Sequence, residues 1–404
     1  MKPLGRSYPF QHISFQVKTF QLCGLWFYMQ HNIKSPTFWF DFLLKGFIGI
    51  FVFFIPPLGQ IIYLTKLIFS GKAEVQEGCG TINLILTELM TSLGLLNLRG
   101  RRSLFKELVM QMDRKEFSRF QRLEAKNIIE KSVKLSKKLF VWLTARFIID
   151  IKQVKLHTII VPALKGFKVL PVNMDFIFFD VYENPYFNII IVYQILYKLI
   201  LLLTFSALQT LRWAFMLCAI SQLDILIYNL KNMKIQDINK TSEKNKSFYN
   251  AFRRNVIHHN AIIQFVKAIE STFGGQFTLF FLINSCVICT TAIQFISVQN
   301  PIDHIMDIFW MFGFLSILIF ILFFDCYFGT IITEKNSYIS TVIYCYPWID
   351  LPNNAKKNLI IFIGRNQRTL AINAAKLIPV SIETFTKIMN WTYKCFAILN
   401  HMKN

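Results

Sequence analysis

The stretch FNIIIVYQILYKLILLLTF, residues 187–205, is apolar over almost its whole length. An α-helix needs about 20 apolar residues to cross the hydrocarbon core of a bilayer, so this stretch alone predicts a membrane-spanning helix. The apolar residues continue through Leu230, which is more than one crossing requires. The far end of this helix is therefore expected to project beyond the membrane.

The composition of the whole chain indicates the same class of protein. Of its 404 residues, 54% are hydrophobic, which exceeds the roughly 45–50% of an ordinary soluble domain. The net charge of +21 suits a nucleic-acid-binding protein, but the basic residues lie between the apolar blocks, where they mark a cytoplasmic membrane face. Membrane lipid is thus an expected partner of the chain, and nucleic acid is not.

Seven apolar blocks are long enough to be membrane helices, which predicts an all-α membrane protein with seven transmembrane helices. The third block is the most polar, because Arg146 interrupts it and Asp150 closes it. A kink is expected in the first block at Pro56 and Pro57. The blocks cover residues 38–69, 81–98, 139–151, 187–230, 277–298, 305–332 and 381–402.

The charges of the connecting segments predict the orientation. Residues 99–138 hold 13 basic and 5 acidic residues, and residues 231–254 hold 7 basic and 2 acidic. Both segments are expected to be cytoplasmic, because Lys and Arg concentrate on that side. Residues 150–186 balance 4 basic against 4 acidic residues, as an external segment does. The amino terminus is therefore predicted to be cytoplasmic and the carboxyl terminus extracellular, which is opposite to a G-protein-coupled receptor.

The motifs of catalysis and metal binding are missing from the sequence. Cys286 and Cys289 form a CVIC motif inside an apolar block, but no second pair completes a tetrahedral metal site. His258 and His259 have no Cys, Asp or Glu at ligand spacing. We therefore expect no enzyme activity, no cofactor and no metal.

Two stretches of the carboxyl-terminal half resemble the insect odorant receptors. The first is HHNAIIQFVKAIESTFGGQFTLFFLINSCVICTTAIQF at 258–295. The second, at 326–400, includes Gly329, Ser337, the 344–348 segment, Leu351-Pro352 and the basic run at 365–368. Its closing motif departs from the family at Lys394 and Cys395. The related gustatory receptors are an alternative, although their terminal TY-x5-QF pattern is absent.

The resemblance implies a tetrameric, odorant-gated, non-selective cation channel in the plasma membrane, as in a sensory neuron dendrite. Its partners would be a small volatile ligand and an odorant co-receptor subunit, or further copies of the chain. Residues 1–37 would be a cytoplasmic segment, 38–230 helices one to four, 231–258 a cytoplasmic loop, 259–351 helices five and six, 352–375 a cytoplasmic anchor helix and 376–404 the pore-lining helix.

The resemblance also implies roles for residues near the carboxyl terminus. Ile398 matches the apolar gate of the pore, and His401 and Met402 match its outer positions. The alternative is that these side chains only pack against lipid or protein. The basic residues of the anchor helix would lie at the subunit interface; they are Lys356, Lys357, Arg365 and Arg368.

A volatile ligand needs a mostly apolar pocket, and the outer halves of helices two, three, four and six are the available walls. Tyr193 and Tyr197 are four residues apart and share a helix face. The candidate ligand contacts are Thr87, Met90, Trp142, Phe147, Tyr193, Tyr197, Trp310 and Phe314. Packing is the alternative role for each. A transporter or a G-protein-coupled receptor remains the alternative class, distinguished by inverted repeats or by an external amino terminus.

Overall fold

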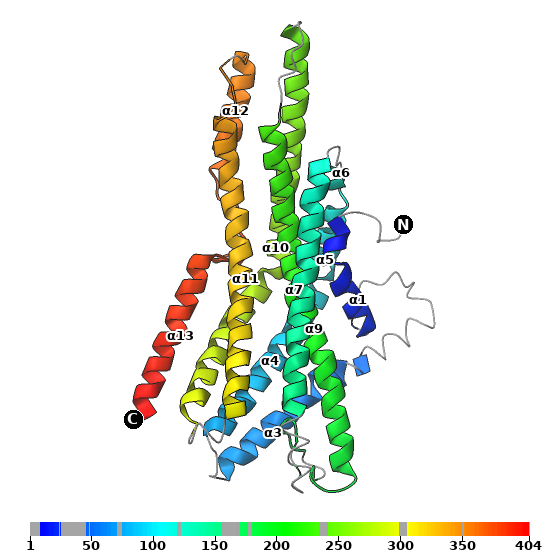
Figure 1. Ribbon diagram of the computed structural model, residues 1–404, viewed down its shortest axis with the longest axis vertical. Coiled ribbons are helices and arrows are strands. Elements are labelled where there is room, and N and C mark those ends of the chain that lie inside the picture. The colour runs from blue at the N-terminus through cyan, green and yellow to red at the C-terminus, as the bar shows by residue number, and fades with distance from the viewer. Residues whose placement is uncertain are drawn as a thin grey trace, which may run out of the picture.

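The protein is a bundle of long helices that run close to the long axis of the molecule (Figure 1). The computed structural model describes residues 9–23, 25, 46–47, 49–70, 75–118, 123–155, 168, 170–176, 180–233, 241–298, 305–349 and 351–403. Within these residues, two short strands are the exception to the helical architecture. The predicted all-α class is confirmed.

The order of the elements follows the chain. It is η1 (Pro9–His12), α1 (Ser14–Leu22), α3 (Ile55–Phe69), α4 (Val75–Gly100), α5 (Arg102–Met112), α6 (Lys115–Ser118), α7 (Leu123–Lys155), α9 (Tyr186–Lys231), α10 (Thr241–Ile296), α11 (Ile305–Tyr344), α12 (Asn353–Asn366), β1 (Asn373–Ala374), β2 (Ile378–Pro379) and α13 (Ile382–Lys403). The two strands pair antiparallel.

Five of the described helical segments are long and apolar enough to cross a membrane. They are Gly49–Phe69, Gln76–Gly100, Tyr186–Lys231, Phe248–Ile296 and Ile308–Tyr344. The other two predicted spans fall on α7 and α13, which have 33 and 22 residues. Both helices have the length of a span, but they carry more polar and charged residues than the five.

Helix α9 lies at the centre of the bundle and packs against α4, α7, α10 and α11. Residues 204–223 of α9 are buried without interruption, including Trp213, Phe215 and Leu223. This explains why the sequence of α9 is apolar all round instead of on one stripe. The ring of Phe215 on α9 packs in tilted geometry against the rings of Phe265 and Phe273 on α10.

Two predicted boundaries differ from the structure. The first apolar block is helical from Gly49, is interrupted at Phe54 and continues as α3, whose first turn holds Pro56 and Pro57. The predicted loop 231–258 is helical from Thr241 onward. The predicted helix 352–375 ends at Asn366, and the chain then forms the β1–β2 hairpin, whose turn has Ala375 and Lys376 at positive φ.

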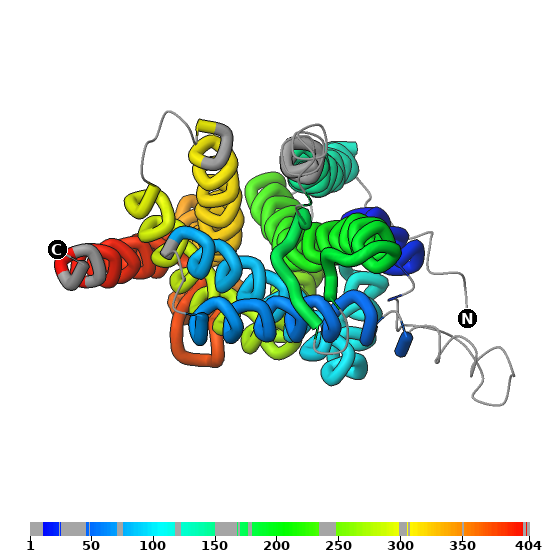
Figure 2. Tube along the Cα trace, turned by 90° about the horizontal axis from the view of Figure 1, so that it is seen from below, coloured from blue at the N-terminus to red at the C-terminus, as the bar shows by residue number. Residues whose placement is uncertain are grey.

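Different segments between the helices lie at the two ends of the bundle. Helices α6 and α12, the end of α9 and the start of α10 lie toward one end, which carries the basic segments (Figure 1). The start of α9 and the start of α11 lie at the opposite end. Helix α13 lies along the edge of the bundle in both views and contacts α10 and α11 (Figures 1 and 2). The basic segments and the segment before α9 therefore lie at opposite ends, which agrees with the predicted separation of the loops into two sets.

Candidate ligand site and pore helix

The eight predicted ligand contacts form separate groups in the structure. Tyr193 and Tyr197 lie next to each other on α9, with ring centroids 5.4 Å apart. Trp310 and Phe314 stack on α11 at 5.6 Å. Neither of the two cavities described below is lined by all eight side chains, and a shared pocket for them stays a prediction.

The two predicted contacts on α7 pack toward different neighbours. Trp142 meets Phe320 of α11, with ring centroids 6.0 Å apart, and Phe147 meets Phe205 of α9 at 5.4 Å. Phe147 is buried, whereas Trp142 is 41% exposed. The α7 residues therefore connect α7 to both α9 and α11.

The predicted contacts on α4 flank a buried carboxylate. Thr87 donates to the backbone of its own helix, and Met90 is buried. Between them lies Glu88, whose Oε1 accepts hydrogen bonds from Gln60 Nε2 at 3.0 Å and from Tyr197 Oη at 3.4 Å. The sequence places this ionisable residue inside an apolar block and close to two candidate contacts, which is the signal that marks it as a site residue.

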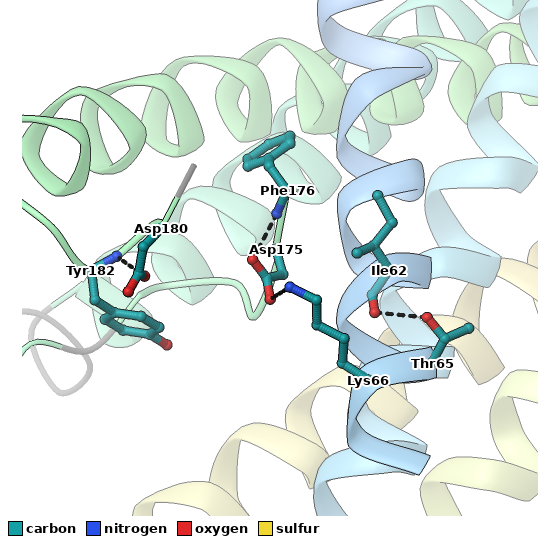
Figure 3. Close-up of polar contacts among 7 residues, drawn as sticks. All are labelled: Ile62, Thr65, Lys66, Asp175, Phe176, Asp180 and Tyr182. Carbon is teal, nitrogen blue, oxygen red and sulfur yellow. Dashed lines mark hydrogen bonds and ion pairs between the residues drawn. The ribbon is translucent and has the colours of Figure 1, made fainter. Parts of the chain in front are cut away.

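A segment before α9 covers this group of residues. Gln194 of α9 accepts a hydrogen bond from Val172 N at 3.0 Å and donates one to Val172 O at 2.9 Å. Lys66 of α3 pairs with Asp175 at 2.5 Å (Figure 3). Val172 and Tyr197 belong to one buried apolar cluster. The segment 170–176 is thus bound to both α3 and α9, and it packs in the same apolar cluster as Tyr197.

The same figure shows the next turn of this segment, where Asp180 accepts a hydrogen bond from the backbone N–H of Tyr182 (Figure 3). Burial raises the pKa of Tyr182, and the nearby carboxylates of Asp175 and Glu77 raise it further. The phenol of Tyr182 therefore stays neutral at physiological pH.

Two cavities lie near these helices in the part of the chain that the structure describes. One is bordered by a single predicted ligand contact, Met90, and the other by none of them. A cavity of about 10 Å³ is bordered by Met90, Gln209, Arg212 and Gln276 among others, and it has room for about one water molecule. A cavity of about 500 Å³ lies between the ends of α9 and α11, where Leu230, Tyr338 and Tyr346 line it. Its residues belong to the end of the bundle that carries α12.

A buried ion pair joins α9 to α11. Arg212 and Asp325 are both fully buried, and Arg212 Nη2 lies 2.7 Å from Asp325 Oδ2. Trp213 Nε1 donates to the other carboxylate oxygen at 2.8 Å. The guanidinium also lies 4.9 Å from the ring centroids of Phe277 and Phe280. The charge of Arg212 inside the apolar helix α9 is therefore balanced by the Asp325 carboxylate.

Helix α13 is attached to α11 at a close backbone contact. A Cβ on Gly329 would overlap the carbonyl oxygen of Val380, so only glycine fits there. One residue later, Thr330 Oγ1 accepts a hydrogen bond from Ile382 N at 2.9 Å. The first turn of α13 is thereby fixed to α11.

The rest of α13 exposes large apolar side chains. Trp391 and Tyr393 are each 70% exposed and Ile398 is 61% exposed. His401 is also exposed, and the side chain of Met402 lies outside the described residues. On α12, Lys357 and Arg365 are exposed and Lys356 is partly exposed, and Arg368, which follows the helix, is exposed. The described side chains among the predicted pore and interface residues are therefore exposed or partly exposed in a single chain.

The fold defines a multi-pass, all-helical membrane protein. Residues 74–393 match the family described as 7tm Odorant receptor. The chain belongs to this odorant receptor family.

Individual relatives are distant in sequence. Odorant receptor 85c of Drosophila melanogaster is 25% identical over 190 residues, which are 46% of this chain and 47% of that one. Odorant receptor 10 of Aedes albopictus is 23% identical over 60% of this chain and 63% of its own length. The odorant receptor coreceptor of Drosophila melanogaster is 24% identical over 37% of this chain and 30% of its own length. The chain spans about half the length of the first of these relatives.

A solved structure shares the fold over nearly the whole chain. The insect olfactory receptor OR5 from Machilis hrabei, in complex with eugenol, has a TM-score of 0.80 and 14% identity, covering 96% of this chain and 97% of that chain. The structure of the same receptor described without eugenol has a TM-score of 0.75. At this identity the likeness establishes the fold alone.

Proposed function

We propose that this chain is the odorant-binding subunit of a ligand-gated, non-selective cation channel in the plasma membrane. A small volatile molecule binds among the outer halves of α4, α7, α9 and α11. Binding opens a pore lined by α13, with Ile398 at the gate and His401 and Met402 outside it. The family match over residues 74–393 carries this proposal.

The position of α13 and the exposure of its side chains support assembly with further subunits. The helix lies at the edge of the bundle with Trp391, Tyr393 and Ile398 exposed. On a membrane helix, exposed apolar residues contact lipid or a neighbouring subunit. In the proposed tetramer, α13 faces the central axis, and α12 with the residues that follow it contacts the neighbouring subunits through Lys356, Lys357, Arg365 and Arg368. The other subunits are an odorant co-receptor or further copies of this chain.

Patch-clamp recording tests the proposal. The chain is expressed in oocytes with and without a co-receptor, and a panel of volatile molecules is applied while GDP-β-S blocks G-protein signalling. We expect a ligand-evoked cation current that needs the chain and persists under the block. A response that GDP-β-S abolishes identifies a G-protein-coupled receptor, and uptake of labelled ligand without current identifies a transporter.

A further inference from the structure

A buried carboxylate lies within the membrane-spanning part of the bundle, where α3, α4 and α9 meet. Glu88 is 2% exposed. Ionisable side chains inside membrane spans are costly, and they commonly mark a site of function. The surroundings of Glu88 therefore indicate what it binds.

Only one of the two carboxylate oxygens is occupied by the protein. Gln60 and Tyr197 both donate to Oε1, at 3.0 and 3.4 Å. Oε2 is buried and has no hydrogen-bond partner among the described residues. A buried acceptor without a donor is unfavourable, so a donor from outside the protein would stabilise it.

Two tyrosine rings lie beside this carboxylate. The Tyr197 ring is 1% exposed and its hydroxyl contacts the carboxylate, while the Tyr193 ring lies 5.4 Å from it, centroid to centroid. Tyr193 is half-buried, with its hydroxyl donating to Phe51 O. Aromatic faces attract cations. A carboxylate beside tyrosine rings is thus a setting for an ammonium group.

Among the described residues, Lys198 is the cation with an electrostatic interaction with the Glu88 carboxylate. Although it follows Tyr197 directly, it forms no ion pair with Glu88 within 4.0 Å in the described part of the chain. Its ammonium therefore partly balances the negative charge of the carboxylate without occupying Oε2. A second cation that enters the site competes with Lys198.

We propose that Glu88, with Tyr193 and Tyr197, is the polar anchor of the ligand site and selects volatile amines. A carboxyl group and an amine form the same ammonium–carboxylate pair whichever of them brings the proton. The pair places an N–H donor on Oε2 and a positive charge beside the tyrosine rings. The inference rests on the proposed function, because it names the ligand class of that receptor.

Access from the bilayer is compatible with such a ligand. Phe51 on the segment before α3, and Val192 and Leu196 on α9, are 38%, 58% and 55% exposed. Half-buried Tyr193 lies between this apolar surface and the buried Tyr197. An amine with an apolar body partitions into the membrane and reaches Glu88 with its polar end first.

Binding to the purified full-length receptor in lipid nanodiscs tests the inference. The probes are hexylamine, cyclohexylamine and phenethylamine, each beside the alcohol of the same carbon skeleton. Wild type is expected to bind at least one amine more tightly than its alcohol. Glu88→Gln should weaken amine binding about tenfold or more, because it removes a charge-assisted contact, and leave alcohol binding nearly unchanged. Glu88→Asp should retain part of the preference.

A second variant acts in the opposite direction. Lys198→Met removes the competing cation and should tighten amine binding while leaving alcohol binding unchanged. This variant decides the question if Glu88→Gln does not fold. An equal loss for amines and alcohols in Glu88→Gln, or unchanged amine binding in Lys198→Met, would show that Glu88 is a structural link between α3, α4 and α9.

The outcomes also separate this inference from the proposed function. Amine binding that depends on Glu88, without any ligand-evoked current, contradicts the channel and leaves the amine site standing. Currents evoked by other volatile molecules, with no preference for amines in wild type, contradict the amine site and leave the channel standing.

Discussion

Arg212 and Asp325 form an ion pair across α9 and α11 in which neither side chain has any exposed surface. The carboxylate also accepts from Trp213, so both of its oxygens have donors. Asp325 lies four residues before Gly329 on α11, and at Gly329 this helix meets the segment that leads into α13. Helix α9, which carries two candidate ligand contacts, is thereby connected to the helix that holds the proposed pore helix.

Removing one partner of this pair should destabilise the protein strongly. Asp325→Asn leaves a buried guanidinium without its counter-charge, which costs about 3–5 kcal/mol in folded proteins. The thermal unfolding midpoint of the purified receptor should fall. Arg212→Met combined with Asp325→Leu should recover much of the loss, since no charge remains buried. A double variant less stable than Asp325→Asn would contradict this account.

Gly329→Ala should damage the connection between α11 and α13. The new Cβ overlaps the carbonyl oxygen of Val380, and such overpacking costs about 1–3 kcal/mol. We expect a lower unfolding midpoint and a smaller maximal current. Gly364→Ala on α12 is the matched control, because a Cβ there meets nothing within 4 Å. Equal effects of the two substitutions would show that the close contact has no special role.

The orientation of the chain can be measured with epitope tags. A tag before Met1 should be stained only in permeabilised cells, whereas a tag after Asn404 should be stained in intact cells. The reason is the excess of basic residues in 99–138 and 231–254. Staining of the amino-terminal tag in intact cells would rule out the proposed topology.

Substitutions at the predicted ligand contacts should change sensitivity without removing the pore. In Tyr193→Ala or Trp310→Ala, the odorant concentration for half-maximal current should shift, because a ligand contact contributes differential affinity for the open state. A current evoked by a co-receptor agonist in the same cells serves as the control. Unmoved dose–response curves for both variants would place the ligand elsewhere.

The pore assignment of α13 can be tested with one polar substitution. An apolar constriction excludes water, so a hydroxyl at Ile398 should ease wetting. Ile398→Thr keeps the β-branched shape and should raise the resting current. If the resting current does not change, Ile398 is not the gate.

Cysteine accessibility gives a second measurement of the pore. Cys395 is exposed in the native chain, so Cys395→Ser is the background. Thiol reagents applied from outside should block currents of Ile398→Cys and His401→Cys. Modification elsewhere on α13, with neither of these positions reactive in any gating state, would identify α13 as a packing helix.

The sequence by itself determined the class of the protein. Apolar runs such as 187–205 are local signals, because each residue in a membrane helix faces lipid or protein interior and its backbone bonds stay within the helix. The same locality made the family resemblance at 258–295 and 326–400 readable without a structure. The predicted helix 352–375 shows the limit of local reading, because it ends at Asn366 and the hairpin that follows bonds to α10 through Ala375 N and Gly274 O.

Only the tertiary structure decided which side chains meet. The contact of Glu88 with Gln60 and Tyr197, and of Arg212 with Asp325, depends on how each helix is rotated about its axis and how far it is shifted along its neighbours. An almost uniformly apolar helix such as α9 has no polar face that fixes this rotation in the sequence. The packing of bulky side chains between helices sets it, since interiors tolerate few voids and few overlaps.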